Sequence, residues 1–104
     1  MRAIYKIPGE APELRDLANT KAGLRELLGG EIVTSHFCSD ACLIVRRDNG
    51  SLPYNFDFCG LAVHGPALFV ATSGRKFVDM PPASAGFLMG LLEPTEKEFE
   101  NENS

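Results

Sequence analysis

Three cysteines and two histidines carry the most reactive side chains of this chain, and their spacing decides what chemistry they could perform. The group opens with His36, Cys38 and Cys42 and continues downstream with Cys59 and His64. Thiolates and imidazoles at close spacing could make a tetrahedral zinc site. However, the sequence has no Cys-x2-Cys pair, and Cys42 opens an apolar stretch in which cysteine commonly behaves as a small hydrophobe. We therefore expect no metal and no cofactor, and we interpret the cysteines as reduced structural residues.

The same thiols raise the question of covalent catalysis. A cysteine nucleophile needs a histidine base held close by a third polar group. Cys38 or Cys59 could be paired with His36 or His64 in this way, but neither cysteine stands between a strand and the start of a helix. We therefore expect no catalytic residues and no enzyme activity. A minor cysteine-dependent enzyme stays open as an alternative.

Two pairs of basic residues, Arg46-Arg47 and Arg75-Lys76, each stand beside a predicted turn. Together with Tyr54 and Asn55 they could form a rim that binds an anion or a protein partner, and solvated turn charges are the alternative interpretation. The formal net charge of −4 argues against binding to a phosphate backbone, which needs a basic face. We therefore expect no direct sequence-specific binding of nucleic acid.

Residues 52–65 are expected to carry the contact surface, because so long a connection in a small domain is usually functional or disordered. Three aromatic residues alternate there with Asn55 and Asp57. Strict alternation predicts that the aromatic side chains lie on one side and the two polar side chains on the other. A plain strand or loop that completes the sheet is the alternative. The candidate partner-binding residues are Arg46, Arg47, Tyr54, Asn55, Asp57, Arg75 and Lys76.

Turn and cap residues divide the chain into elements. Strands are expected over residues 3–7, 13–17, 31–37, 42–46 and 68–71. Asn19 or Thr20 can cap a helix, which Gly29-Gly30 ends, because glycine accepts the left-handed conformation. Asn49-Gly50 predicts a tight turn with positive φ angles. A second, short helix is expected from Pro81-Pro82 to Leu92.

These elements predict an α+β fold, with a small mixed β-sheet, one main helix packed across it (β-grasp-like), and a short C-terminal helix. With 104 residues, the chain has the size of one domain, expected over residues 1–94, and residues 95–104 are expected to be a disordered acidic tail. No apolar run approaches the roughly 18 residues that cross a bilayer, and Lys6 interrupts the N-terminal stretch that a signal peptide keeps apolar. We therefore expect a cytoplasmic protein with no membrane contact.

Several segments occur together in a recognisable order. They are Pro8-Gly9, Pro12-Glu13-Leu14-Arg15, Leu28-Gly29-Gly30-Glu31-Ile32, Cys42-Leu43-Ile44-Val45, Leu52-Pro53-Tyr54-Asn55 and Gly65-Pro66-Ala67-Leu68-Phe69-Val70. Over about residues 1–80 the chain resembles the family catalogued as domain of unknown function 3846, small proteins of phages, mobile elements and Firmicutes. The sequence departs from that family at Arg46-Arg47-Asp48, where an acidic, Asn-Glu-like turn is expected.

The resemblance implies a phage or mobile-element setting and no established catalytic residues, with Asn55 as a structural or binding residue. Small non-enzymatic phage proteins often inhibit host defence by binding, and this analogy suggests the function. The leading hypothesis is an accessory protein that binds and inhibits a bacterial defence component, such as a CRISPR or restriction effector, in the host cytoplasm. The first alternative is a protein that binds a small anionic ligand, or a sponge for a nucleotide signal. A homodimer is left open.

Overall fold

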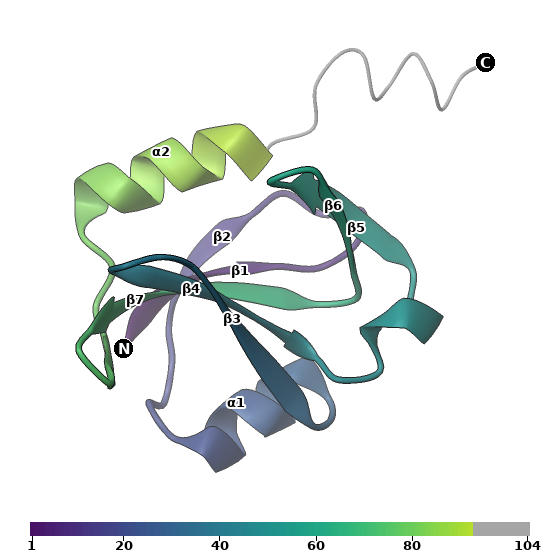
Figure 1. Ribbon diagram of the computed structural model, residues 1–104, viewed down its shortest axis with the longest axis horizontal. Helices are drawn as coiled ribbons and strands as arrows, with labels where there is room; N and C mark the ends of the chain where they lie inside the picture. The colour runs from purple at the N-terminus through teal and green to yellow at the C-terminus, as the bar shows by residue number, and fades with distance from the viewer. Residues whose placement is uncertain (93–104) are drawn as a thin grey trace.

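The computed structural model describes residues 1–92 as a mixed α+β fold (Figure 1). In chain order the elements are β1 (Arg2–Lys6), β2 (Glu13–Asp16), α1 (Lys21–Leu28), β3 (Ile32–Cys38), β4 (Ala41–Arg46), the 3-10 helix η1 (Asn49–Ser51), β5 (Tyr54–Phe58), β6 (Leu61–His64), β7 (Ala67–Ser73), β8 (Lys76–Val78) and α2 (Pro82–Leu92). The strands expected from the sequence are present, each within two residues of its predicted bounds. The expected acidic tail lies outside the described residues.

The main sheet has the strand order β2-β1-β7-β4-β3, and β8 extends it by pairing with the end of β7. β7 is central, because it pairs with β4 along one edge and with β1 and then β8 along the other. All pairings within this sheet are antiparallel, so the prediction of a mixed sheet is wrong. The direction of β1 against β7 depends on contacts between distant parts of the chain, which local sequence patterns do not reveal.

Helices cover both faces of the sheet (Figure 1). α1 packs on one face, where Leu24 and Leu28 are buried with Val70. α2 and the β5–β6 hairpin cover the opposite face, where Leu88 belongs to the cluster around Phe69. The expected arrangement of one main helix and a short C-terminal one is not confirmed, since α1 has 8 residues and α2 has 11. The β-grasp-like topology is not confirmed.

Local signals set both ends of α1. The N-cap is Thr20, whose Oγ1 accepts a hydrogen bond from the N–H of Gly23 at 3.0 Å. Gly29 ends the helix with a φ of 86°, in the left-handed region that favours glycine. Both predicted caps are therefore confirmed. Asn19, the other candidate cap, instead donates from Nδ2 to the carbonyl of Phe77 in β8 at 3.0 Å.

Residues 48–65 differ from the prediction. Neither Asn49 nor Gly50 has a positive φ, and the expected tight turn is the 3-10 helix η1. The irregular connection expected next is a two-stranded hairpin of β5 and β6, separate from the main sheet. The positive φ angles lie at its tip, 52° at Cys59 and 78° at Gly60. Asn49-Gly50 therefore forms a turn without positive φ angles, whereas the hairpin turn lies at Cys59-Gly60, where the sequence signal is weaker.

Candidate functional site

The two predicted basic pairs lie at opposite ends of the main sheet. β4 and β7 run antiparallel, with Ala41 opposite Ala71 at one end and Val45 opposite Ala67 at the other. Arg75 and Lys76 lie just beyond the end of β7 that contains Ala71. Arg46 and Arg47 lie at the end of β4 that contains Val45, which is the opposite end of the sheet. The expected common rim is therefore not formed. Sequence patterns placed each pair beside a turn but could not show that the turns are at opposite ends.

Arg46 is held by neighbouring groups of its own chain. Its Nε and Nη2 donate to the two carboxylate oxygens of Asp48 at 2.9 and 2.7 Å. These hydrogen bonds from Arg46 hold the pKa of Asp48 below its usual value. The guanidinium also lies against Gly29-Gly30 at the end of α1. Arg46 is thus a structural residue at the junction of α1 and β4, and Arg47 stays exposed beside it.

Asn55 is buried, so its expected role as a direct partner contact is corrected. Its Oδ1 accepts a hydrogen bond from Nζ of Lys6 at 2.8 Å, and its Nδ2 donates to the carbonyls of Lys6 and Gly65 at 2.9 and 2.7 Å. A register shift between Tyr54 and Phe56 interrupts the alternation along β5. As a result Asn55 and Phe56 are both buried, and the expected division into an aromatic side and a polar side is wrong.

The remaining predicted residues of this hairpin are exposed. Tyr54 is 51% exposed, and its ring meets that of His64 edge-on, with the centroids 5.9 Å apart. Asp57 is exposed on the same strand. Both could contact a partner, but neither lies beside the basic pair at Arg75.

The three cysteines have separate environments. Cys38 is exposed and donates from Sγ to Asp40 at 3.1 Å. Cys42 is buried in the sheet, and this burial, with a smaller effect of Cys38, raises its pKa to about 11. The candidate base His64 pairs through Nδ1 with the carbonyl oxygen of Leu52 at 3.0 Å. Within residues 1–92, no group of three or more His, Cys, Asp or Glu side chains is placed to hold a metal ion.

The backbone conformation at Cys59 disfavours cysteine, and this gives a first prediction. Its φ of 52° is left-handed, and side chains other than those of Gly, Asn and Asp adopt this region at a cost of roughly 1 kcal/mol. Cys59→Asn should therefore stabilise the protein by about 0.5–1 kcal/mol, measured by chemical denaturation under reducing conditions. Cys59→Ala is the matched control, because Ala removes the thiol without favouring this φ. Equal stability of the two variants would contradict the explanation.

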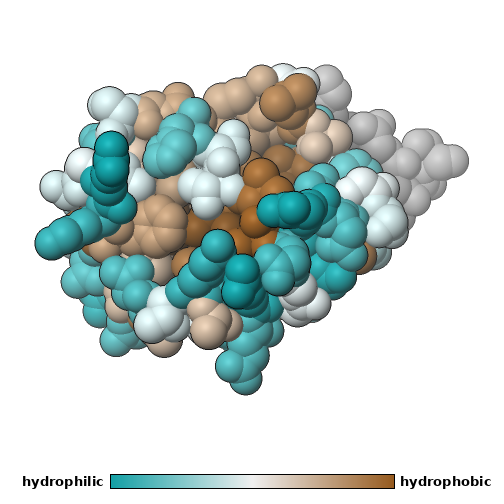
Figure 2. Space-filling model, turned by 60° about the horizontal axis from the view of Figure 1, so that its bottom comes forward, coloured by the Kyte–Doolittle hydropathy of each residue, from teal (hydrophilic) through white to brown (hydrophobic). Residues whose placement is uncertain are grey.

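A pocket of about 540 Å³ opens between α1, β3 and the β7–β8 turn. Its lining residues are Asn19, Lys21, Leu24, Ile32, Thr34, Arg75, Lys76 and Phe77. α1 thus leaves part of its sheet face uncovered. Figure 2 shows a hollow with a hydrophobic floor, bordered by hydrophilic side chains, on the side of the molecule that comes forward from the bottom of Figure 1. We call this hollow the basic pocket.

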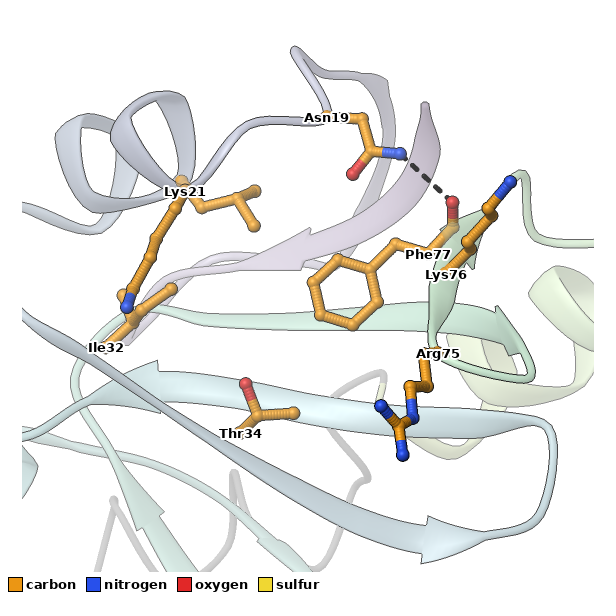
Figure 3. A pocket seen from close by; sticks show the side chains of 8 residues that line it. Asn19, Lys21, Ile32, Thr34, Arg75, Lys76 and Phe77 are labelled. Carbon is orange, nitrogen blue, oxygen red and sulfur yellow. Dashed lines mark hydrogen bonds between the residues drawn. The ribbon is translucent and has the colours of Figure 1, made fainter.

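Two cations face the basic pocket from different elements (Figure 3). Lys21, the first residue of α1, extends toward Ile32, and Arg75 in the β7–β8 turn extends toward Thr34. The ring of Phe77 points in between them, while the ammonium group of Lys76 points away. The hydrogen bond from Asn19 to Phe77 joins the segment before α1 to β8, the two elements that form opposite walls of the pocket.

Sequence reasoning identified Arg75 and Lys76 but missed Lys21 and Phe77. The N-cap at Thr20 locates Lys21 at the first turn of the helix, where a cation opposes the helix dipole. A cation at this unfavourable position could have marked Lys21 as a candidate functional residue. Nothing in the sequence indicated that it lies across a hollow from Arg75.

A second, apolar pocket of about 170 Å³ lies on the opposite face of β3. It is lined by Ser35, Phe37, Leu43, Val45, Asn49, Phe58, Cys59, Leu61, Ala62 and Val63. None of these side chains is charged, and Leu61 is 71% exposed at its border. β3 therefore separates a basic pocket from an apolar one.

Comparison with known proteins adds no relative to these observations. No family model, no curated protein and no solved structure matches the chain. The resemblance based on the sequence segments therefore stays a prediction. Among residues 1–92, neither helix has the length and apolar character needed to span a membrane.

Proposed function

We propose that this protein acts by binding, and that the basic pocket takes an anionic group carried on an apolar body. The observation that carries the proposal is the placement of Lys21 and Arg75 on separate walls around an apolar floor with Phe77 between them. Small sites of this kind combine apolar lining with a few charged groups that orient the ligand. Hydrogen bonds from Arg or Lys to phosphate or carboxylate are about twice as strong as neutral ones.

The biological setting that we propose is an accessory protein of a phage or mobile element, acting in the bacterial cytoplasm against a defence component. The family resemblance supports this setting. In the first version of the proposal, the anionic groups belong to a host protein, and the exposed Phe87 (69%) and Leu91 (58%) of α2 also suit a protein partner. In the alternative, they belong to a nucleotide signal, whose base could stack on Phe77.

We do not propose cysteine-dependent catalysis. Cys38 donates to Asp40 and to the carbonyl of Ala41, and Cys59 lies at the hairpin tip in the lining of the apolar pocket. The raised pKa of Cys42 keeps its thiol protonated at neutral pH. A nucleophilic cysteine would instead need a nearby histidine base or a lowered pKa.

The proposal is tested with two anions that share the charge but differ in the apolar body, pyrophosphate and ATP. We expect both anions to shift the NMR signals of residues that line the basic pocket, and ATP to do so at a lower concentration than pyrophosphate. Added salt should weaken the binding of both anions. The variant Lys21→Ala/Arg75→Ala should bind ATP at least about tenfold more weakly, since each charge-assisted contact contributes roughly 1.5 kcal/mol or more.

Arg47→Ala is the matched control, because Arg47 is exposed at the far end of the sheet. It should bind ATP like the unmodified chain. A loss of binding free energy in Arg47→Ala that is half or more of the loss in the double variant would show that ATP responds to overall charge, since the control removes one cation and the double variant two. In that case, or if neither anion shifts the pocket signals, the proposed function would be wrong.

A further inference from the structure

β3 forms one edge of the main sheet, and it lacks the charges, the proline and the short length that commonly protect an edge. In the described part of the chain, β4 is the only strand that pairs with it. Natural edge strands are commonly short or carry charges or proline, which discourages pairing with another chain. β2 at the opposite edge follows this rule, with four residues that include Glu13, Arg15 and Asp16. β3 has seven residues, Ile32–Cys38, without proline or Asp, Glu, Lys or Arg. Its register shift lies between His36 and Cys38, so the edge is regular from Ile32 to His36.

The hydrogen bonds to β4 show which backbone groups of β3 face the open edge. In an antiparallel pair, residues that exchange hydrogen bonds alternate with residues whose backbone groups point away. The N–H of Arg47 donates to the carbonyl of Glu31 at 2.8 Å, so residues 31, 33 and 35 point toward β4. Ile32, Thr34 and His36 therefore direct their N–H and C=O groups outward.

The two pockets lie on the two faces of this same strand. Ile32 and Thr34 line the basic pocket, whereas Ser35 and Phe37 line the apolar pocket. A strand added to β3 would direct alternate side chains to opposite faces. One set would lie beside Lys21 and Arg75, and the other beside an apolar surface. In such complexes the main-chain hydrogen bonds supply affinity, and pockets for alternate side chains supply specificity.

We propose that the open edge of β3 binds an extended segment of a partner protein in which acidic side chains alternate with apolar ones. The charge of the basic pocket selects the acidic set, and the apolar pocket selects the other. The inference rests on the proposed function for the acidic side chains, because they would meet the same two cations. It goes further in naming the ligand as a peptide strand and in assigning a register along Ile32, Thr34 and His36.

The probe is a short capped peptide in which Glu and Leu alternate, and its control has the same composition with Glu and Leu in separate blocks. With the alternating peptide, hydrogen exchange of the Ile32, Thr34 and His36 amides should slow at least tenfold, while the amides of Val33 and Ser35 change little. N-methylation of the peptide amides that face β3 should abolish this protection, and methylation of the other amides should not. Equal effects of both methylations, or no protection at all, would overturn the proposal.

His36→Pro tests the edge from the side of the protein, because His36 lines neither pocket. It removes an outward N–H and leaves the hydrogen bonds to β4 in place, and proline is tolerated at such positions of edge strands. The variant should lose peptide binding at least tenfold and keep ATP binding within about twofold, which separates the edge from the basic pocket. If His36→Pro does not fold, the methylated peptides decide alone.

The outcomes distinguish the two proposals and the other occupants of the edge. ATP binding without peptide binding would overturn only the strand proposal. Register-specific peptide binding that is unaffected by Lys21→Ala/Arg75→Ala would overturn the anion site and the selection of acidic side chains, while the addition of a strand to β3 would stand. Protection of the outward amides without peptide would overturn the partner assignment. If this protection grows with protein concentration, the edge of β3 binds a second copy of the chain. If it disappears on changing Glu96, Glu98, Glu100 and Glu102 to Gln, the occupant is this chain's own acidic segment.

Discussion

Asn55→Ala should lower the midpoint of thermal unfolding by about 10–25 °C, which corresponds to roughly 2–4 kcal/mol in a domain of this size. Asn55 is 8% exposed and joins β5 to the end of β1 and to the β6–β7 connection, since its amide bonds to the side chain and carbonyl of Lys6 and to the carbonyl of Gly65. Alanine removes one acceptor of a buried cation and the donor for two buried carbonyls. Such losses cost more than the net strength of the hydrogen bonds themselves.

Asp57→Ala is the matched control on the same strand. Its side chain is exposed, so its removal should change the midpoint by only a few degrees. Far-UV circular dichroism and calorimetry of both variants check the prediction. An Asn55→Ala protein as stable as Asp57→Ala would contradict a structural role and restore Asn55 as a surface contact.

Gly65→Ala should be similarly damaging, at about 2–4 kcal/mol of unfolding free energy. Gly65 has a φ of 73°, which costs an alanine roughly 1 kcal/mol. An added Cβ would also lie 2.5 Å from Cδ1 and 3.2 Å from Cβ of Leu52. The end of the leucine side chain can rotate, but its Cβ cannot move without the backbone, and overpacking of this kind costs typically 1–3 kcal/mol.

Gly74→Ala separates these two causes. Gly74 also has a positive φ, 61°, but an added Cβ there would meet no atom within 4 Å. We expect this variant to lose only about 1 kcal/mol, measured by urea denaturation beside Gly65→Ala. Equal losses in the two variants would mean that the backbone conformation alone accounts for the glycine at position 65.

Asn55 and Gly65 also bear on the binding surfaces. Together with Lys6 they join β5 and the end of β6 to the end of β1, and the same hairpin forms one wall of the apolar pocket. We therefore expect a folded Asn55 variant to lose peptide affinity through a displaced hairpin. Loss of binding in such a variant would be an indirect effect and no evidence of contact.

The sequence by itself determined the features that depend on neighbouring residues. Thr20 and Gly29 set the ends of α1, because a cap acts within one helical turn. Apolar runs and alternation located five of the six strands of the main sheet, and Pro81-Pro82 located the start of α2. The α+β class follows from these elements. β6 and β8 were missed, since three or four residues carry too little pattern to mark a strand.

Only the tertiary structure decided what lies together. The register shift at Asn55 turned an expected contact residue into a buried hydrogen-bonding one, because the alternation of a strand holds only while the ladder is regular. The antiparallel pairing of β4 with β7 sent the two basic pairs to opposite ends of the sheet. It was the packing of α1 beside β8 that brought Lys21 to the pocket of Arg75, a contact between residues far apart in the chain that no local pattern could express.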